Sequence, residues 1–197
     1  MSQREDLLAG AKKCLVDKGY SRTTARDIAA ASGAHLASIG YHFGSKDNLM
    51  NTAVIEASSE WGDLFEAGVR AAGRRTPRER VHDLLESLFR TMPDQMPVLV
   101  AGTQALAQVP FDADVREKMT AAHEQARVSM AALVLGVPEG DVDAATAAGL
   151  GSVTYALVTG YVMQAVVDPD SLPAPDQAAA GIMALAGTAA PEGSTSP

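Results

Sequence analysis

The chain has 197 residues, of which 47% are hydrophobic and 20% charged, enough for one large domain or two small ones with a buried core. A single cysteine excludes a disulfide framework, and with only four histidines it argues against a structural zinc site. Residues 1–50 hold seven Lys and Arg against five Asp and Glu, whereas residues 51–197 hold nine against nineteen. This asymmetry predicts a small anion-facing head on a larger acidic body.

Helix signals dominate the first quarter of the chain. Ser2 with Glu5, and Thr24 with Asp27, have the spacing of a helix capping box. Apolar residues then recur at helical spacing, and the alternating runs expected of strands are absent, so the predicted fold class is all-α. Here we expect helices at residues 3–18, 24–32, 35–43 and 46–72.

Proline and glycine punctuate the rest of the chain. Pro77 suits the first position of a helix, whereas Pro93 and Pro97 are expected to break one. The predicted helices of the body cover residues 77–92, 98–108, 112–135, 141–167 and 176–186. The last residues, 189–197, are predicted to form a disordered tail.

One uncharged segment raises the possibility of a membrane span. The 24 residues from Ala144 to Val167 carry no charge, which is long enough to cross a bilayer. Ten of them are Gly, Ser, Thr, Gln or Tyr, and the flanks are Asp143 and Asp168 rather than a cluster of Lys and Arg. A helix packed on both sides is therefore favoured over a membrane span.

Residues 19–50 contain two short helices joined by a tight turn centred on Gly33, the layout of a helix-turn-helix, whose second helix enters the major groove of DNA. This segment contains the string Gly19…Thr24-x-x-x-Ile28-Ala29-x-x-x-Gly33…Ile39-x-Tyr41-His42-Phe43-x-Ser45-Lys46-x-x-Leu49. Residues 4–50, which contain this string, resemble the N-terminal domain of the TetR family of transcriptional regulators. The resemblance implies a DNA-binding head and an effector-binding, dimer-forming helical body.

Three residues have the chemistry to hold DNA phosphates. Tyr41 offers a hydroxyl and Lys46 an ammonium group, and both Thr24 and Lys46 lie at helix N-termini, where the backbone favours anions. Family members use the matching positions in this way. The alternatives are a helix cap for Thr24, an aromatic filler for Tyr41 and a solvated charge for Lys46; their joint spacing favours phosphate binding.

Base contacts are expected from the second helix of the motif and from Arg26 before it. Arg26 suits a bidentate contact to guanine, although a surface salt bridge is nearly as good an interpretation. Gly40 stands where the family often has an aromatic residue, and packing is the favoured role of His42, which also belongs to the motif. The remaining candidates are His35, Leu36, Ala37 and Ser38.

In the resembled family, effectors enter a pocket among the middle helices. Apolar and Met-rich linings adapt to varied apolar ligands, and ordinary core packing is the alternative for each residue. The candidate lining residues are Trp61, Phe65, Phe89, Met92, Met96, Leu99, Met119, His123 and Met130.

The uncharged helix is predicted to form a homodimer together with residues 176–186, as the last two helices of the family do. Small side chains let helices approach closely, and the candidate interface residues are Ala148, Ser152, Ala156, Thr159, Gly160 and Met163. The opposite side is expected to face the protein's own core through Leu150, Val153, Leu157 and Val158. The alternative is that the whole helix is buried within one monomer.

These patterns predict a DNA-binding head at residues 1–46, an effector-binding and dimerisation domain at 47–188, and a tail at 189–197. The expected function is repression of transcription, with release from a palindromic double-stranded DNA operator by a small, apolar effector. The alternatives are an architectural DNA binder without an effector and a helical-bundle enzyme. The sequence lacks recognisable catalytic motifs, so we expect no enzyme, metal or cofactor. It also opens without a secretory apolar run, which predicts a cytoplasmic protein with no membrane partner.

Overall fold

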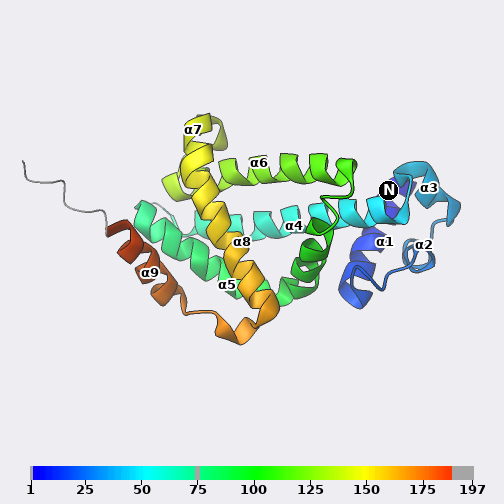
Figure 1. Cartoon of the computed structure of the whole chain (residues 1–197), viewed down its shortest axis with the longest axis horizontal. Helices are drawn as coiled ribbons and strands as arrows, with labels where there is room; N and C mark the ends of the chain where they lie inside the picture. The colour runs from blue at the N-terminus through cyan, green and yellow to red at the C-terminus, as the bar shows by residue number, and fades with distance from the viewer. Residues whose placement is uncertain (1, 74–75, 188–197) are drawn as a thin grey trace, which may run out of the picture.

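Three helices form the head of the molecule: α1 (Gln3–Lys18), α2 (Ala25–Ser32) and α3 (Ala37–Phe43). The main helices of the body are α4 (Lys46–Ala71), α5 (Pro77–Leu106), α6 (Ala113–Leu135), α8 (Ser152–Val167) and α9 (Pro175–Gly187). The computed structural model describes residues 2–73 and 76–187, and within these ranges it contains helices and no strand (Figure 1). The predicted all-α fold is therefore confirmed.

The helix-turn-helix of the head follows from its capping residues. Thr24 begins α2, where its side chain accepts a hydrogen bond from the backbone N–H of Asp27 and the Asp27 carboxylate accepts one in return. Gly33 ends α2 with a φ of 69°, a left-handed conformation that costs glycine nothing. The recognition helix α3 begins at Ala37, two residues after the predicted start at His35.

The core of the head continues into the body. Every head helix contributes apolar side chains to it: Leu7, Leu15, Ile28, Ile39 and Leu49 join from α1, α2, α3 and the start of α4. The same cluster includes residues of α5 and α6, namely Ala101, Ala105, Val115 and Met119. Displacement of these body residues therefore reaches the head through direct contact.

Helix α4 links the two ends of the molecule. Its 26 residues correspond to a length of about 39 Å at 1.5 Å per residue. Lys46 lies at its head end, whereas Trp61 and Phe65 are buried in a second apolar core inside the body. Figure 1 shows α4 running from the head along the body beside α5 and α6.

The predicted break between residues 92 and 98 is wrong, because α5 stays helical through Pro93 and Pro97. A proline inside a helix removes one hydrogen bond and clashes with a preceding carbonyl, at a cost of about 3 kcal/mol. Buried side chains on both sides of the prolines, including Met92 and Leu99, hold the helix against its neighbours. The prolines bend α5 rather than end it, and Figure 1 shows its last turns running in a different direction.

The uncharged segment is one irregular helical rod. Asp143 caps its start, and α7 (Ala144–Thr146), the π-helical η2 (Ala147–Gly151) and α8 follow one another without a break. The predicted start at Asp141 is wrong, because Glu139–Asp141 forms the separate 3-10 helix η1. A side chain at Gly151 would collide with the backbone carbonyl of Arg127 on α6, so glycine is needed for this close approach.

One face of α8 packs against the body. Thr154, Val158 and Ala165 face the body and are buried. Val153, which was predicted to face the core, is 62% exposed, so that expectation is wrong for this residue. At 3.6 residues per turn, Val153 lies about 140° around the helix axis from Val158, so it falls outside this buried face.

By length and composition, Ala144–Val167 is the one described segment that could cross a membrane, although only 22% of its most apolar stretch is buried in the body. The alternative that one monomer buries the whole helix is therefore wrong.

After α8, η3 (Pro169–Ser171) leads to α9, which packs against α5. The predicted tail at 189–197 lies outside the described residues.

Candidate DNA-binding surface and effector region

Helix α3 presents one face to the core and the other to solvent. Ile39 is buried and Phe43 packs against the head core, whereas Tyr41 is 87% exposed. Four of the base-contact candidates in or just before this helix are also exposed: His35, Leu36, Ala37 and Gly40. The fifth, Ser38, is half-buried. This geometry places a row of small and polar groups on the outer face of a helix held firmly from behind, as readout in a DNA groove requires.

At the start of α2, Asp27 is paired with Lys18 of α1. Thr24 and Arg26 are exposed, and Asp27 accepts hydrogen bonds from Lys18 and Thr24. These bonds, that of Lys18 first, hold the pKa of Asp27 well below its usual range. Asp27 therefore stays ionised, and its charge is balanced by that of Lys18. The Arg26 side chain is exposed and can reach an anion.

Lys46 lies at the N-terminus of α4 and already has two neighbours. Its Nζ is 2.8 Å from Oδ1 of Asp47 and 5.9 Å from the ring centroid of Tyr20. The pair with Asp47 is exposed on the Asp47 side, and exposed pairs contribute only about 0–1 kcal/mol. A phosphate can therefore displace Asp47 from Lys46 at little cost.

His42 faces the head rather than solvent alone. Its ring packs edge-on against Tyr41, with centroids 4.9 Å apart, and Nε2 lies 3.4 Å from Oε1 of Gln3. These contacts agree with the packing role favoured for His42. They also orient Tyr41, whose hydroxyl is carried outward.

A polar junction that the sequence pattern did not indicate joins the head to the body. The Tyr20 hydroxyl donates a 2.7 Å hydrogen bond to Oδ1 of Asn51, and both side chains are buried. Burial, with the charges of Asp47 and Asp112, raises the pKa of Tyr20 to about 12. Nearby, Ser21 binds Gln104 of α5 at 3.2 Å. Only tertiary contact reveals these pairs, because the partners are 31 and 83 residues apart.

The residues predicted to line an effector pocket lie in two places. Seven belong to the body core or pack against it: Trp61, Phe65, Phe89, Met92, Met96, Leu99 and Met130. Within that core, Nε1 of Trp61 donates a 3.0 Å hydrogen bond to the hydroxyl of Thr91. The other two, Met119 and His123, line an open groove of about 250 Å³ near the end of α5. The assignment of all nine to an effector site stays a prediction.

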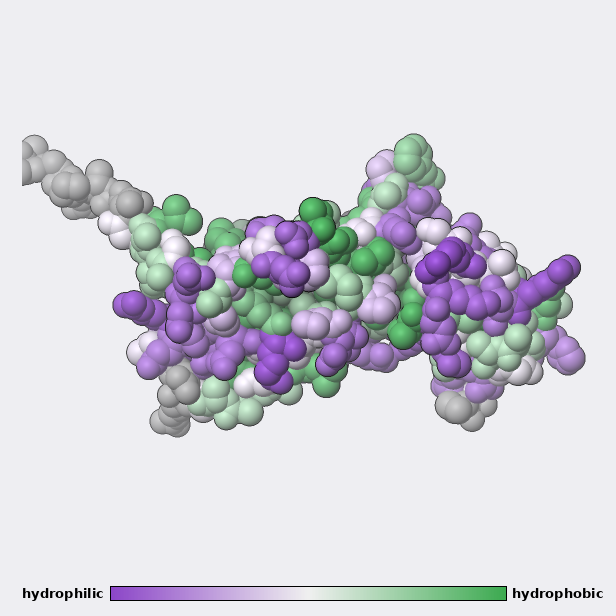
Figure 2. Space-filling view, turned by 90° about the horizontal axis from the view of Figure 1, so that it is seen from below, coloured by the Kyte–Doolittle hydropathy of each residue, from purple (hydrophilic) through white to green (hydrophobic). Residues whose placement is uncertain are grey.

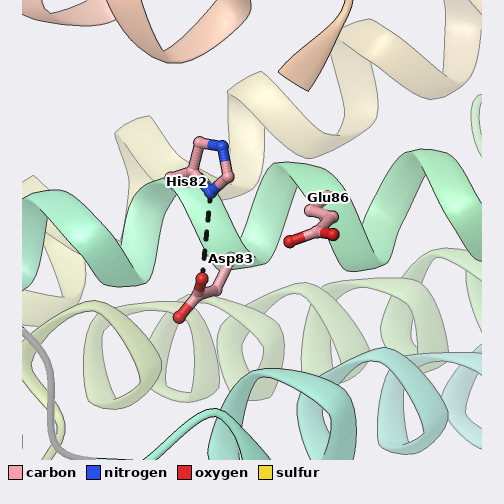
Figure 3. Close-up of side chains that lie close together, drawn as sticks. All are labelled: His82, Asp83 and Glu86. Carbon is pink, nitrogen blue, oxygen red and sulfur yellow. Dashed lines mark ion pairs between the residues drawn. The ribbon is translucent and has the colours of Figure 1, made fainter. Parts of the chain in front are cut away.

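Three potential metal ligands gather on α5, as Figure 3 shows. Ligand atoms of His82, Asp83 and Glu86 lie within 4.8 Å of one another. Nδ1 of His82 lies 3.8 Å from Oδ1 of Asp83, and Nε2 lies 2.8 Å from Oδ1 of Asp176 on α9. The His82–Asp176 contact ties α9 to α5, which gives His82 a structural role that needs no ion.

The outward side of α8 is an apolar stripe, here defined as Val153, Ala156, Gly160, Met163 and Val167. Its members recur at intervals of three and four residues, and Val153 and Val167 are 62% and 81% exposed. Of the predicted interface residues, Ala148, Ala156 and Met163 are exposed, whereas Ser152, Thr159 and Gly160 are half-buried. Figure 2 shows hydrophobic surface gathered over the body and mainly hydrophilic surface over the head.

Two family profiles match this chain. Residues 7–53 match bacterial regulatory proteins of the tetR family, and residues 77–189 match the C-terminal domain of BetI-type transcriptional repressors. The second match alone covers more than half of the chain, and both describe transcriptional regulators rather than enzymes.

Two curated relatives are similar over shorter stretches. The chain is 38% identical over 63 residues to the transcriptional repressor AcnR of Corynebacterium glutamicum, covering 32% of this chain and 34% of AcnR. It is 29% identical over 87 residues to the transcriptional regulator BetI 1 of Chromohalobacter salexigens, covering 44% of this chain and 43% of BetI 1. The matched stretches therefore span less than half of these relatives.

The whole fold recurs in solved structures. The multidrug-binding protein EbrR, solved in complex with imidazole, superposes with a TM-score of 0.66 at 20% identity, covering 99% of this chain and 98% of that one. At that identity the likeness establishes the fold alone. Because the family matches cover both head and body, the chain belongs to the tetR family of bacterial regulatory proteins, with a C-terminal domain of the BetI type.

Proposed function

We propose that this protein is a transcriptional repressor that binds a palindromic operator in the cytoplasm as a homodimer and leaves it when a small effector binds the body. The observation that carries the proposal is the outer face of α3, where Tyr41 and the base-contact candidates are exposed while Ile39 anchors the helix from behind. Thr24 and Lys46 flank this face at two helix N-termini, which suit phosphates.

The α8 stripe supports the dimer. A single helix-turn-helix contacts few base pairs, whereas two copies about 34–36 Å apart read successive major grooves. A second copy of α8 would cover the apolar stripe, with Ala156 and Gly160 allowing close approach of the two helices. The repressors BetI and AcnR among its relatives favour repression as the output.

The shared core supports coupling between effector and operator. Helix α4 begins at the phosphate-binding end and passes through the body core at Trp61 and Phe65. An effector that binds more tightly to the DNA-incompetent arrangement would shift the population toward release. The effector is expected to be mainly apolar, because the residues around Trp61 are.

Recovery of bound DNA from a fragmented bacterial genome tests this function. The protein should enrich a small set of fragments that share a palindrome, and a metabolite extract should release it from them. If gel shifts show no binding to any fragment at low salt, the proposal is wrong. Binding that no extract fraction reverses would instead favour a constitutive regulator.

A further inference from the structure

An open groove lies where the body meets the head. It is formed by the end of α5, residues 107–112 and the first half of α6, and its volume is about 250 Å³. Figure 1 shows the α5–α6 connection at the end of the body nearest the head. This groove is smaller than the roughly 300–1,000 Å³ of sites for drug-sized molecules, so it suits a compact ligand.

The lining of the groove is apolar with one cationic corner. Leu106, Val109, Pro110 and Met119 form apolar walls, and its surface is predominantly apolar. Arg116 stands at one corner, where its guanidinium donates a 3.2 Å hydrogen bond to the carbonyl of Pro110. Arginine has five N–H donors, and most of them remain to be satisfied by solvent or a ligand.

Two further polar groups complete the groove. Thr120 offers a hydroxyl, and His123 an imidazole whose pKa is lowered by burial and by the charge of Arg127. This lowering favours the neutral imidazole, which can donate one hydrogen bond and accept another. The lining of the groove contains no carboxylate, because Glu117 and Glu124 lie on the adjoining face of α6. Arg116 is the one charged side chain in this lining, so it is the place where an anion would bind.

From this lining we infer that the groove is a regulatory site for a small amphipathic carboxylate, with its apolar tail against Met119 and its carboxylate on Arg116. A planar guanidinium binds a carboxylate through two parallel hydrogen bonds, and the apolar walls bury the tail. This inference rests on the proposed repressor function, but it places the site of this ligand in the groove, separate from the core around Trp61, and gives the ligand's chemical class.

The groove also has direct contacts to the parts that would respond. Met119 belongs to the core that the head shares with the body, and Gln104, two residues before Leu106, binds Ser21 of the head. On the other side, the His123 ring lies 5.3 Å from that of Tyr155 on the dimer-forming helix α8. A ligand in the groove would contact Met119, which belongs to the core shared with the head, and His123, which packs on Tyr155 of α8.

Octanoate is a suitable probe, and the site can be located by NMR of the protein labelled with 13C at its methionine methyl groups. Octanoate should shift the Met119 signal while leaving those of Met92 and Met130, which lie in the other core, unchanged. Arg116→Gln should weaken octanoate binding by about tenfold and leave octan-1-ol binding unchanged. Arg78→Gln, an exposed arginine at the far end of α5, is the matched control and should bind octanoate normally.

A second variant, Thr120→Trp, fills the groove from an exposed position and should abolish the Met119 shift. The regulatory role requires that octanoate lower operator affinity in the unmodified protein and not in Arg116→Gln. The inference is overturned if octanoate shifts Met92 or Met130 instead, if Arg116→Gln binds it equally, or if bound octanoate leaves operator affinity unchanged. Failure of the unliganded protein to bind any DNA would instead contradict the proposed function, whatever octanoate does at Met119.

Discussion

At the scale of single residues, the proposed phosphate ligands of the head already have partners within the protein. Lys46 pairs with its neighbour Asp47, and Thr24 shares hydrogen bonds with Asp27, which also pairs with Lys18. The sequence pattern could predict Lys46 and Thr24 as phosphate ligands because their types and positions fit a known motif. It could not predict the Asp47 pair, because a side chain's choice of partner depends on rotamers and packing.

Removal of the competing acid should strengthen DNA binding, whereas removal of Lys46 should weaken it. Asp47→Asn frees Lys46 and removes a negative charge near the phosphates, so affinity should rise a few-fold for all sequences alike. Lys46→Ala should lower it uniformly and reduce the slope of log affinity against log salt by about one. Fluorescence anisotropy over a salt series measures both; Lys13→Ala, at an exposed pair with Asp17, is the control and should change neither. An unchanged salt slope in Lys46→Ala would remove Lys46 from the interface.

The burial of Tyr20, with the nearby charges of Asp47 and Asp112, should make stability depend on pH in the alkaline range. The pKa of Tyr20 is raised to about 12 in the folded protein, above its ordinary value of 10. Below pH 10 the proton is bound in both states; between pH 10 and 12 the unfolded chain loses it first, so stability falls as pH rises. Tyr20→Phe should lose this component and cost about 1–3 kcal/mol at pH 8, because Asn51 loses a buried donor. Urea unfolding at pH 8 and 11 gives both values, and equal pH dependence in the two proteins would refute the assignment.

At the scale of elements, most helices of the fold could be predicted because caps and apolar periodicity are local signals. Thr24 marks the start of α2 and Gly33 marks its end, before the turn to α3. The failure to predict a continuous α5 has a tertiary cause, because packing around Met92 and Leu99 holds the helix together across its prolines. Val153 lies in the regular part of α8, about 140° around the helix axis from the buried Val158 at 3.6 residues per turn, so it falls outside the buried face.

Two glycines in the π turn offer a matched test of the close approach of α6. Gly151→Ala places a methyl group against the backbone carbonyl of Arg127, and such overpacking costs about 1–3 kcal/mol. Gly149→Ala lies in the same turn with nothing within 4 Å of the added carbon, so it should be neutral or stabilising. Thermal unfolding distinguishes them, and equal melting temperatures would show that α6 does not constrain this turn.

At the scale of the whole molecule, the α8 stripe is the proposed surface of assembly. Ala156→Arg should put an unpaired charge into the proposed dimer interface, so dimer and operator affinities should fall together. Ala121→Arg, at an exposed position on α6, is the control and should alter neither. Sedimentation equilibrium measures the first affinity and gel shifts the second. A monomeric Ala156→Arg that still binds the operator with full affinity would separate assembly from DNA binding.

In the proposed complex, two copies of this chain read one palindrome. The most direct test is the mass of the complex with an operator recovered from the genome, measured by native mass spectrometry on duplexes carrying one or both half-sites. We expect two protomers, or a multiple of two, on the full palindrome with half-sites about 34–36 Å apart, and much weaker binding to a single half-site. One protomer bound with equal affinity to either duplex would rule out this mode of binding.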